Sequence, residues 1–157
     1  MKIGLGIIGC GLIGGKRAQA ASESVKLISC FDIDSEKAKV FANTYNCKNV
    51  SSINQIIKNP EISAVIVSTR HDSLARISEQ ILTEGKHVFV EKPGALNAFE
   101  FSKLVQAKES FNDTKIHIGY NHRHHPSIIK ALELCRTGQI GKILFLRSRY
   151  GHGGRLG

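Results

Sequence analysis

The sequence contains no tryptophan and only three prolines, and aromatic residues make up 6% of it. It also lacks any apolar run approaching the roughly 20 residues that a membrane span requires, so no transmembrane helix is predicted. A strand-like segment and glycines directly follow Met1-Lys2, with no long apolar core and small-residue cleavage site, so a signal peptide is not indicated. We therefore expect a cytoplasmic protein with no membrane partner.

No CxxC pair occurs among the four cysteines, which are Cys10, Cys30, Cys47 and Cys135. Most of them lie in apolar contexts, where a reduced thiol behaves as a small hydrophobe. Neither a disulfide nor a zinc site is indicated. The histidines at positions 122, 124 and 125 are better explained by a polar loop or an anion-binding cleft than by a metal site.

Acidic residues are nearly absent from the C-terminal part. Residues 1–113 contain 14 Lys and Arg against 12 Asp and Glu, whereas residues 114–157 contain 8 against Glu133 alone. This excess fits a site for an anionic substrate, or one half of a charge pattern whose acidic complement is not in this chain. No helix-turn-helix, zinc finger or aromatic-basic pattern accompanies it, so we expect no nucleic acid partner.

Short apolar segments alternate with amphipathic ones along the first 121 residues. The periodicity predicts strands at 3–8, 25–34, 49–50, 63–69, 87–93 and 115–121, and helices at 12–22, 35–45, 53–58, 73–85 and 97–110. Continuous β-branched runs such as SAVIVST at 63–69 are typical of parallel strands that are covered on both faces. The pattern predicts an α/β fold with a doubly wound parallel sheet of the Rossmann type.

The alternation stops beyond residue 121. A helix is expected within 125–141, beginning near Pro126 and ending near Gly138. The segment KILFLRSRY at 142–150 alternates like a strand of a different, antiparallel sheet with one wet face. We therefore predict a dinucleotide-binding domain at 1–122 and the beginning of a second α+β domain at 123–157. The chain would then be a fragment or a natural truncation. The unpaired strand 142–150 would dimerise, dock onto a neighbour or be disordered, and a homo-oligomer is expected.

The segment IIGCGLIGGKR contains Gly9-x-Gly11-x-x-Gly14 between the first strand and the first helix. In the dinucleotide fingerprint the first glycine allows the tight turn, the second admits the pyrophosphate, and the third allows close packing of helix and strand. The residues that open the helix, Leu12 and Ile13, would present backbone N–H groups to the phosphates. A plain strand-to-helix turn and a Rossmann-like methyltransferase are the alternatives.

Asp32 follows the second strand, eighteen residues after Gly14, which is close to the fingerprint's spacing of about 20 residues. A carboxylate there accepts hydrogen bonds from ribose hydroxyls and repels a 2′-phosphate, so NAD is the expected cofactor, with NADP possible because Lys37 is near. Asp34 could be a solvated or capping acid instead. Ser35 is the expected N-cap of the following helix.

Glu91-Lys92-Pro93 lies at the carboxyl end of a predicted buried strand, the edge at which open α/β sheets bind their ligands. A lysine there could exchange a proton with a hydroxyl group while hydride is transferred. The alternative is a surface lysine in a turn that Pro93 fixes.

The glycine fingerprint, Asp32, VSTRHDSLARIS at 67–78, EKPGALN at 91–97 and IGYNHRHHPSI at 118–128 together resemble the N-terminal half of the Gfo/Idh/MocA oxidoreductase family. The resemblance implies an NAD(P)-dependent oxidoreductase acting on a sugar, sugar nucleotide or cyclitol, with Lys92 as the catalytic lysine and a cis bond before Pro93. It further implies that the cofactor contacts Thr69, Arg70, His71, Glu91, Lys92 and Asn121. The implied substrate contacts are Lys92, Arg123 and His124.

Two features depart from the family pattern. The turn TRHD, at 69–72, lacks the proline that many members carry, and this puts the role of His71 in doubt. The downstream histidine segment that partners the lysine in the family is not present. A catalytically inactive nucleotide-binding or interaction module therefore remains the alternative to an enzyme.

Overall fold

The computed structural model of the chain describes residues 2–21, 23–111, 113–149 and 151. The chain divides into two compact units, residues 1–120 and residues 121–157. Tyr150, which ends the last expected strand, lies outside the described residues.

The first unit is built around a parallel sheet of six strands in the order β3-β2-β1-β4-β5-β6. This is the order of the dinucleotide-binding Rossmann fold, so the expected doubly wound α/β sheet is confirmed. The strands are β1 (Ile3–Ile8), β2 (Val25–Phe31), β3 (Lys48–Asn49), β4 (Ala64–Val67), β5 (His87–Val90) and β6 (Ile116–Ile118). The helices are α1 (Leu12–Gln19), α2 (Ser35–Tyr45), α3 (Ile53–Ile57), α4 (His71–Thr83) and α5 (Ala98–Ser110).

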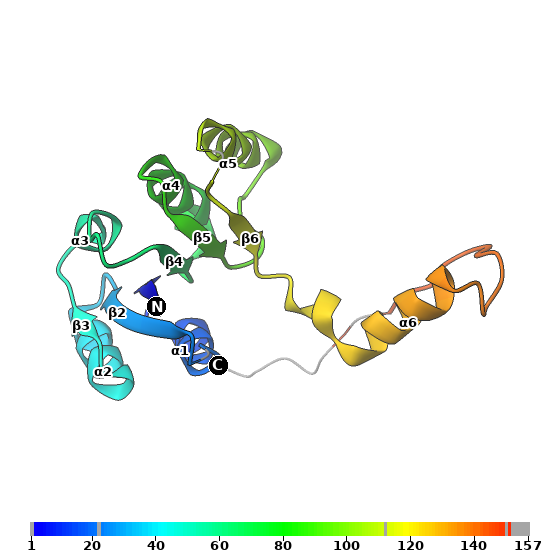
Figure 1. Cartoon of the computed structure of the whole chain (residues 1–157), viewed down its shortest axis with the longest axis horizontal. Coiled ribbons are helices and arrows are strands. Elements are labelled where there is room, and N and C mark those ends of the chain that lie inside the picture. Colours follow the sequence, from blue (N-terminus) through cyan, green and yellow to red (C-terminus); the bar gives the residue numbers. More distant parts are fainter. Residues whose placement is uncertain (1, 22, 112, 150, 152–157) are drawn as a thin grey trace. The chain divides into compact units, whose positions relative to one another are not determined.

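Two apolar clusters fill the two faces of this sheet. In Figure 1, α3, α4 and α5 lie along one side of the sheet and α1 and α2 along the other. The larger cluster joins Val65 and Val67 of β4 to the buried faces of α3, α4 and α5, and the smaller one joins Ile7 of β1 to Phe41 of α2. Helices on both faces leave the carboxyl edge of the sheet as the exposed place for a ligand.

Several element boundaries differ from the sequence prediction by a few residues. Helix α2 is capped by Asp34, whose side chain accepts hydrogen bonds from the N–H groups of Glu36 and Lys37, so the prediction of Ser35 as the N-cap was wrong. Aspartate and serine are equally good caps, and sequence pattern does not choose between neighbours. Helix α4 begins at His71, two residues earlier than expected.

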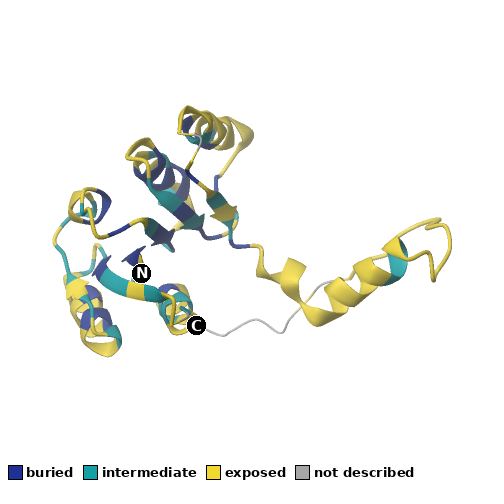
Figure 2. Ribbon diagram, in the orientation of Figure 1, coloured by how far each residue is buried: buried dark blue, intermediate teal, exposed yellow. Residues whose placement is uncertain are grey.

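The second unit consists of the 3₁₀ turn η1 (Asn121–His124) and the helix α6 (Pro126–Arg136) in its described part. Figure 2 shows α6 exposed along almost its whole length. The strand expected over 142–150 was wrong for residues 142–149, which form neither helix nor strand. Alternating polarity gives a segment two different faces, but a strand exists only when a neighbour pairs with its backbone.

None of the helices in the described ranges combines the length and the apolar character that crossing a bilayer requires.

Candidate functional site

The glycine loop joins β1 to α1 at the centre of the sheet. Gly9 adopts φ +100°, which strongly favours glycine, and its N–H donates to the carbonyl of Phe31 over 2.8 Å. Ser68, directly after β4, supports the loop from the other side, since its hydroxyl donates to the Gly9 carbonyl over 2.8 Å. The loop therefore lies between the ends of β2 and β4, where the strand order of the sheet reverses.

The third and second glycines of the motif have different surroundings. A side chain at Gly14 would clash with the carbonyl oxygen of Gly9, so close packing of α1 on the loop requires glycine there. A side chain at Gly11 would meet no protein atom within 4 Å. Packing alone does not require glycine at position 11, and the open space in front of it gives a pyrophosphate room to approach the backbone.

Helix α1 begins at this loop without a side-chain cap. Gly11 is its N-cap residue, no acidic side chain lies in its first turn, and Leu12 and Ile13 are exposed. The first N–H groups of a helix have no partner within it, and the helix dipole places partial positive charge at this end. These residues can therefore hold a phosphate by backbone hydrogen bonds.

Asp32 is held against the glycine loop by two backbone donors. The N–H of Cys10 donates to Oδ2 over 2.7 Å, and the N–H of Asp34 donates to Oδ1 over 2.9 Å. A carboxylate has about four lone-pair positions, so both oxygens can accept another hydrogen bond. Asp32 is thus fixed in orientation with acceptor capacity to spare for the hydroxyls of a ribose.

Asp34 has the capping role that the sequence left as an alternative to ribose binding. Besides accepting two backbone hydrogen bonds, it forms an exposed ion pair of 3.1 Å with Lys37. The N–H and the ammonium group of Lys37 hold the pKa of Asp34 below its usual range. The charge of Lys37 is thereby partly compensated before any nucleotide phosphate arrives.

The thiol of Cys10 is uncharged beside this carboxylate. A hydrogen bond to the thiol of Cys30, followed by burial and the negative charge of Asp32, raises the pKa of Cys10 above its ordinary value. The side chain of Cys10 therefore adds no negative charge to the loop.

A cavity of about 790 Å³ opens beside Asp32, between the ends of β1, β2 and β4. Of the residues expected to contact the cofactor, it contains Gly9, Gly11, Asp32, Thr69 and Arg70. It does not reach Leu12, Ile13, Gly14, His71, Glu91 or Lys92. His71 is the exposed first residue of α4.

The cavity also includes residues that sequence reasoning missed. Ile33 is 91% exposed although it is apolar, and Arg76 projects from the second turn of α4. Ser73 supports Thr69 by a hydroxyl hydrogen bond of 2.9 Å. The available signal was the sequence position of Ile33, an apolar residue between two acids at a strand end.

Glu91 and Lys92 follow β5 in sequence but have opposite environments. Glu91 is buried and forms an ion pair with Arg17 of α1 at 2.5 Å, whereas Lys92 is exposed. The Lys92-Pro93 peptide bond is cis, as the resemblance implied. The exposed ammonium group lies on the turn at the carboxyl end of β5, so a ligand at this edge of the sheet could reach it.

Asn121, Arg123 and His124 all lie on η1, are exposed, and belong to the second unit rather than to the Rossmann unit that carries Lys92. Within the part of the chain that the structure describes, no three His, Cys, Asp or Glu side chains are grouped to hold a metal ion.

The sheet order, the glycine loop and Asp32 define a dinucleotide-binding Rossmann domain. Residues 3–120 match the model of the Gfo/Idh/MocA oxidoreductase family with its NAD-binding Rossmann fold, and the chain belongs to this family. The family resemblance and the NAD cofactor expected from the sequence are thus confirmed.

Three similar proteins illustrate the range of the family. An inositol 2-dehydrogenase of Salmonella paratyphi B is 23% identical over 155 residues, which are 96% of this chain and 46% of that protein. The UDP-N-acetylglucosamine 3-dehydrogenase of Acidithiobacillus ferrooxidans aligns with a TM-score of 0.78 at 26% identity, over 85% of this chain and 43% of that one. The myo-inositol dehydrogenase of Lactobacillus casei, solved with NAD(H) and myo-inositol, has a TM-score of 0.84 at 24% identity. That alignment covers 90% of this chain and 43% of the other. The chain thus spans about half the length of the curated relatives it matches.

Proposed function

We propose that this chain is the cofactor-binding portion of an NAD-dependent oxidoreductase that acts on a hydroxyl or keto group of a cyclitol, sugar or sugar nucleotide. The observation that carries the proposal is the pair of backbone hydrogen bonds that fixes Asp32 beside the open glycine loop. Such an arrangement prepares one site for a phosphate and the next for a ribose before any ligand binds.

The proposal assigns the cofactor contacts as follows. The backbone of Gly9, Gly11, Leu12, Ile13 and Gly14 holds the pyrophosphate, and Asp32 accepts from the ribose of the adenosine half. Thr69 and Arg70 line the adjoining cavity, with His71 next to them on α4. Glu91, Lys92 and Asn121 contact the nicotinamide half in this proposal.

The negative charge of Asp32 favours NAD over NADP, because a 2′-phosphate would lie against the carboxylate. Lys37 does little to offset this repulsion since its ammonium group is already paired with Asp34 at 3.1 Å.

NAD supplies the hydride acceptor when it is bound. Lys92 binds the reacting oxygen from the turn after β5, where its side chain is exposed. Its neutral amine accepts the hydroxyl proton as hydride leaves the carbon for NAD, and in the reverse direction its ammonium form donates that proton to the keto oxygen. Arg123 and His124 are the further substrate contacts of the proposal. A cyclitol is the first candidate substrate because relatives are named as inositol 2-dehydrogenases, and a UDP-linked sugar is the second because of the dehydrogenase from Acidithiobacillus ferrooxidans.

The test combines an NADH titration by fluorescence with NAD-linked turnover of myo-inositol and of UDP-N-acetylglucosamine by the full-length protein. Lys92→Ala should abolish turnover and leave the NADH affinity nearly unchanged, because the pyrophosphate and ribose contacts remain. Lys103→Ala, on the surface of α5, is the matched control and should behave as wild type. Wild-type turnover in the Lys92 variant would exclude the catalytic lysine, and NADH binding without turnover of any sugar or cyclitol would favour a binding module.

A further inference from the structure

Arg17 of α1 reaches across to the carboxyl end of β5, although 74 positions separate it from its partner in the sequence. Its Nε donates to Oε1 of Glu91 over 2.6 Å, and a terminal guanidinium nitrogen lies 2.5 Å from the same oxygen. Both side chains are largely shielded from water, with exposed fractions of 25% for Arg17 and 11% for Glu91. Partial burial makes this pair stronger than a surface ion pair.

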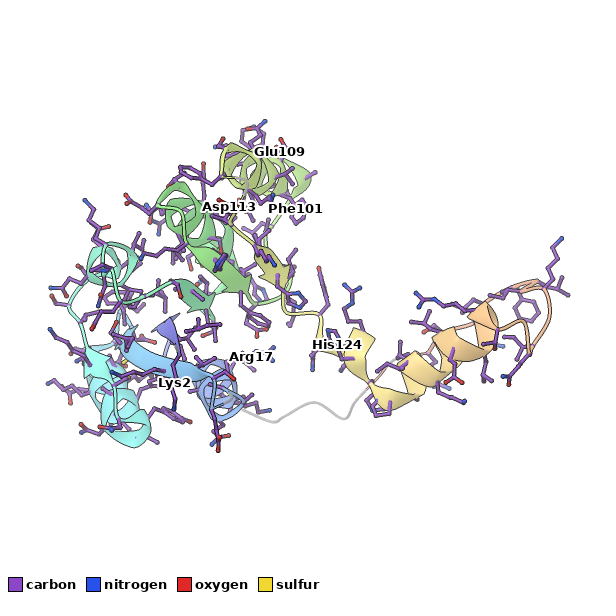
Figure 3. The ribbon with its side chains drawn as sticks, in the orientation of Figure 1. Lys2, Arg17, Phe101, Glu109, Asp113 and His124 are labelled. Carbon is purple, nitrogen blue, oxygen red and sulfur yellow. The ribbon has the colours of Figure 1, made fainter. Side chains whose placement is uncertain are left out.

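The guanidinium group is also fixed by an aromatic surface. It lies 4.9 Å above the ring of Phe89 on β5, and that ring stacks on His117 of β6 at 5.3 Å. Cation–π contact and a forked hydrogen bond are both properties of arginine that lysine reproduces poorly. Figure 3 labels Arg17 on α1.

Glu91 is held by its backbone as well. Its N–H donates to the carbonyl of Val67 and its own carbonyl accepts from the N–H of Gly94, both over 2.9 Å. Its carboxylate packs so closely on Gly119 that a side chain there would come within 3.1 Å of Oε2. The residue before Lys92 is therefore fixed by its backbone hydrogen bonds, by the close approach of Gly119 and by the ion pair with Arg17.

We propose that Arg17 is a positioning residue: through Glu91 it holds the Lys92-Pro93 turn at a fixed place relative to α1, the helix whose first turn faces the cofactor phosphates. The inference rests on the proposed function for its catalytic meaning. Arg17 touches neither cofactor nor substrate in this proposal. It acts by joining the phosphate-binding helix to the lysine turn, so that cofactor binding and the placement of Lys92 are mechanically coupled.

The role of Arg17 could not be predicted from the sequence. Arg17 is outside the dinucleotide fingerprint, and it follows Lys16, an exposed residue of the same charge on the same helix. The adjacent lysine therefore offers a matched control: Lys16→Gln removes one positive charge from α1 without touching Glu91.

The experiment is hydrogen exchange of the purified full chain, read on the peptide that covers residues 91–97, with β1 and β4 as reference. Removing one partner of a shielded pair leaves the other uncompensated, so Arg17→Gln should raise exchange at 91–97 by about tenfold. Exchange in β1 and β4 should stay unchanged. Lys16→Gln should match wild type, and Arg17→Lys should fall between the two.

A double variant isolates the pair. If Arg17 acts through Glu91, the combination of Arg17→Gln with Glu91→Gln should exchange no faster than the faster of the two single variants. NADH should slow exchange at 91–97 in wild type and do so less in Arg17→Gln at equal occupancy.

Unchanged exchange at 91–97, or an equal rise in β1 and β4, would overturn the positioning role. Additive effects in the double variant would overturn it too. Failure of the wild type to bind NADH would instead contradict the proposed function, while the exchange measured without NADH would still decide the role of Arg17.

Discussion

The backbone N–H of Cys10 donates a 2.7 Å hydrogen bond to Oδ2 of Asp32, and this bond closes the glycine loop against the end of β2. The same carboxylate accepts from the N–H of Asp34 through its other oxygen. Asp32 therefore fixes the conformation of the loop, and its oxygens can still accept hydrogen bonds from a ribose. Asp34, two residues later, caps α2 instead.

Replacing Asp32 by asparagine should weaken NADH binding by about tenfold to a hundredfold, because hydrogen bonds to a charged group contribute about 1.5–3 kcal/mol. NADPH binding should weaken much less, since the charge that repels its 2′-phosphate is removed as well. Parallel titrations with the two nucleotides measure both effects. A variant that keeps the wild-type ratio of the two affinities would contradict the assigned role.

Two glycines of one motif should respond differently to alanine. Gly14→Ala places a methyl group against the Gly9 carbonyl, and overpacking of this kind costs about 1–3 kcal/mol, so the melting temperature should fall. Gly11→Ala meets no protein atom and should keep most of the stability while weakening NADH binding. Calorimetry and an NADH titration on both variants separate the two roles. Equal losses of stability would show that the space before Gly11 is not free.

The Asp34 cap should weaken in acid. Its folded pKa lies below the unfolded value of about 3.9, so its contribution is complete above about pH 5 and is lost as the pH falls through the folded pKa. The melting temperature of the wild type should therefore exceed that of Asp34→Asn at pH 7, and the difference between the two melting temperatures should shrink toward pH 3. Asp113→Asn, an exposed acid outside the helices, serves as the control and should show no such trend. A difference that is constant with pH would exclude the ion pair as its cause.

Leu104 anchors α5 to the larger core cluster and is 1% exposed. Leu104→Ala should lower the free energy of unfolding by about 2–5 kcal/mol. Urea denaturation measures this loss. The NADH affinity of the folded fraction should stay at the wild-type value, because α5 does not line the cavity beside Asp32. A parallel loss of affinity would mean that the site depends on the packing of α5. Phe101, on the same helix in Figure 3, is 41% exposed. Phe101→Ala should therefore lower the free energy of unfolding by less than Leu104→Ala does.

Element type was predictable from local pattern wherever a segment is buried in its own sheet. The β-branched run at 63–69 predicted β4 because both of its faces are covered, and the spacing from Gly14 to Asp32 predicted which strand ends meet. The same reasoning failed for residues 142–149, where alternation of polarity was present and no partner strand paired with it.

The sequence by itself determined the alternation of strands and helices, the glycine loop and the acid that completes it, because each depends on residues close together along the chain. Only the tertiary structure decided that Asp32 binds Cys10, that Asp34 is a cap, and that Arg17 pairs with Glu91. Such pairs join strand ends and helices brought together by the crossover connections of the sheet. Whether such a pair forms depends on distances of a few ångströms between segments that are far apart in the sequence. The spacing of residues along the chain does not give these distances.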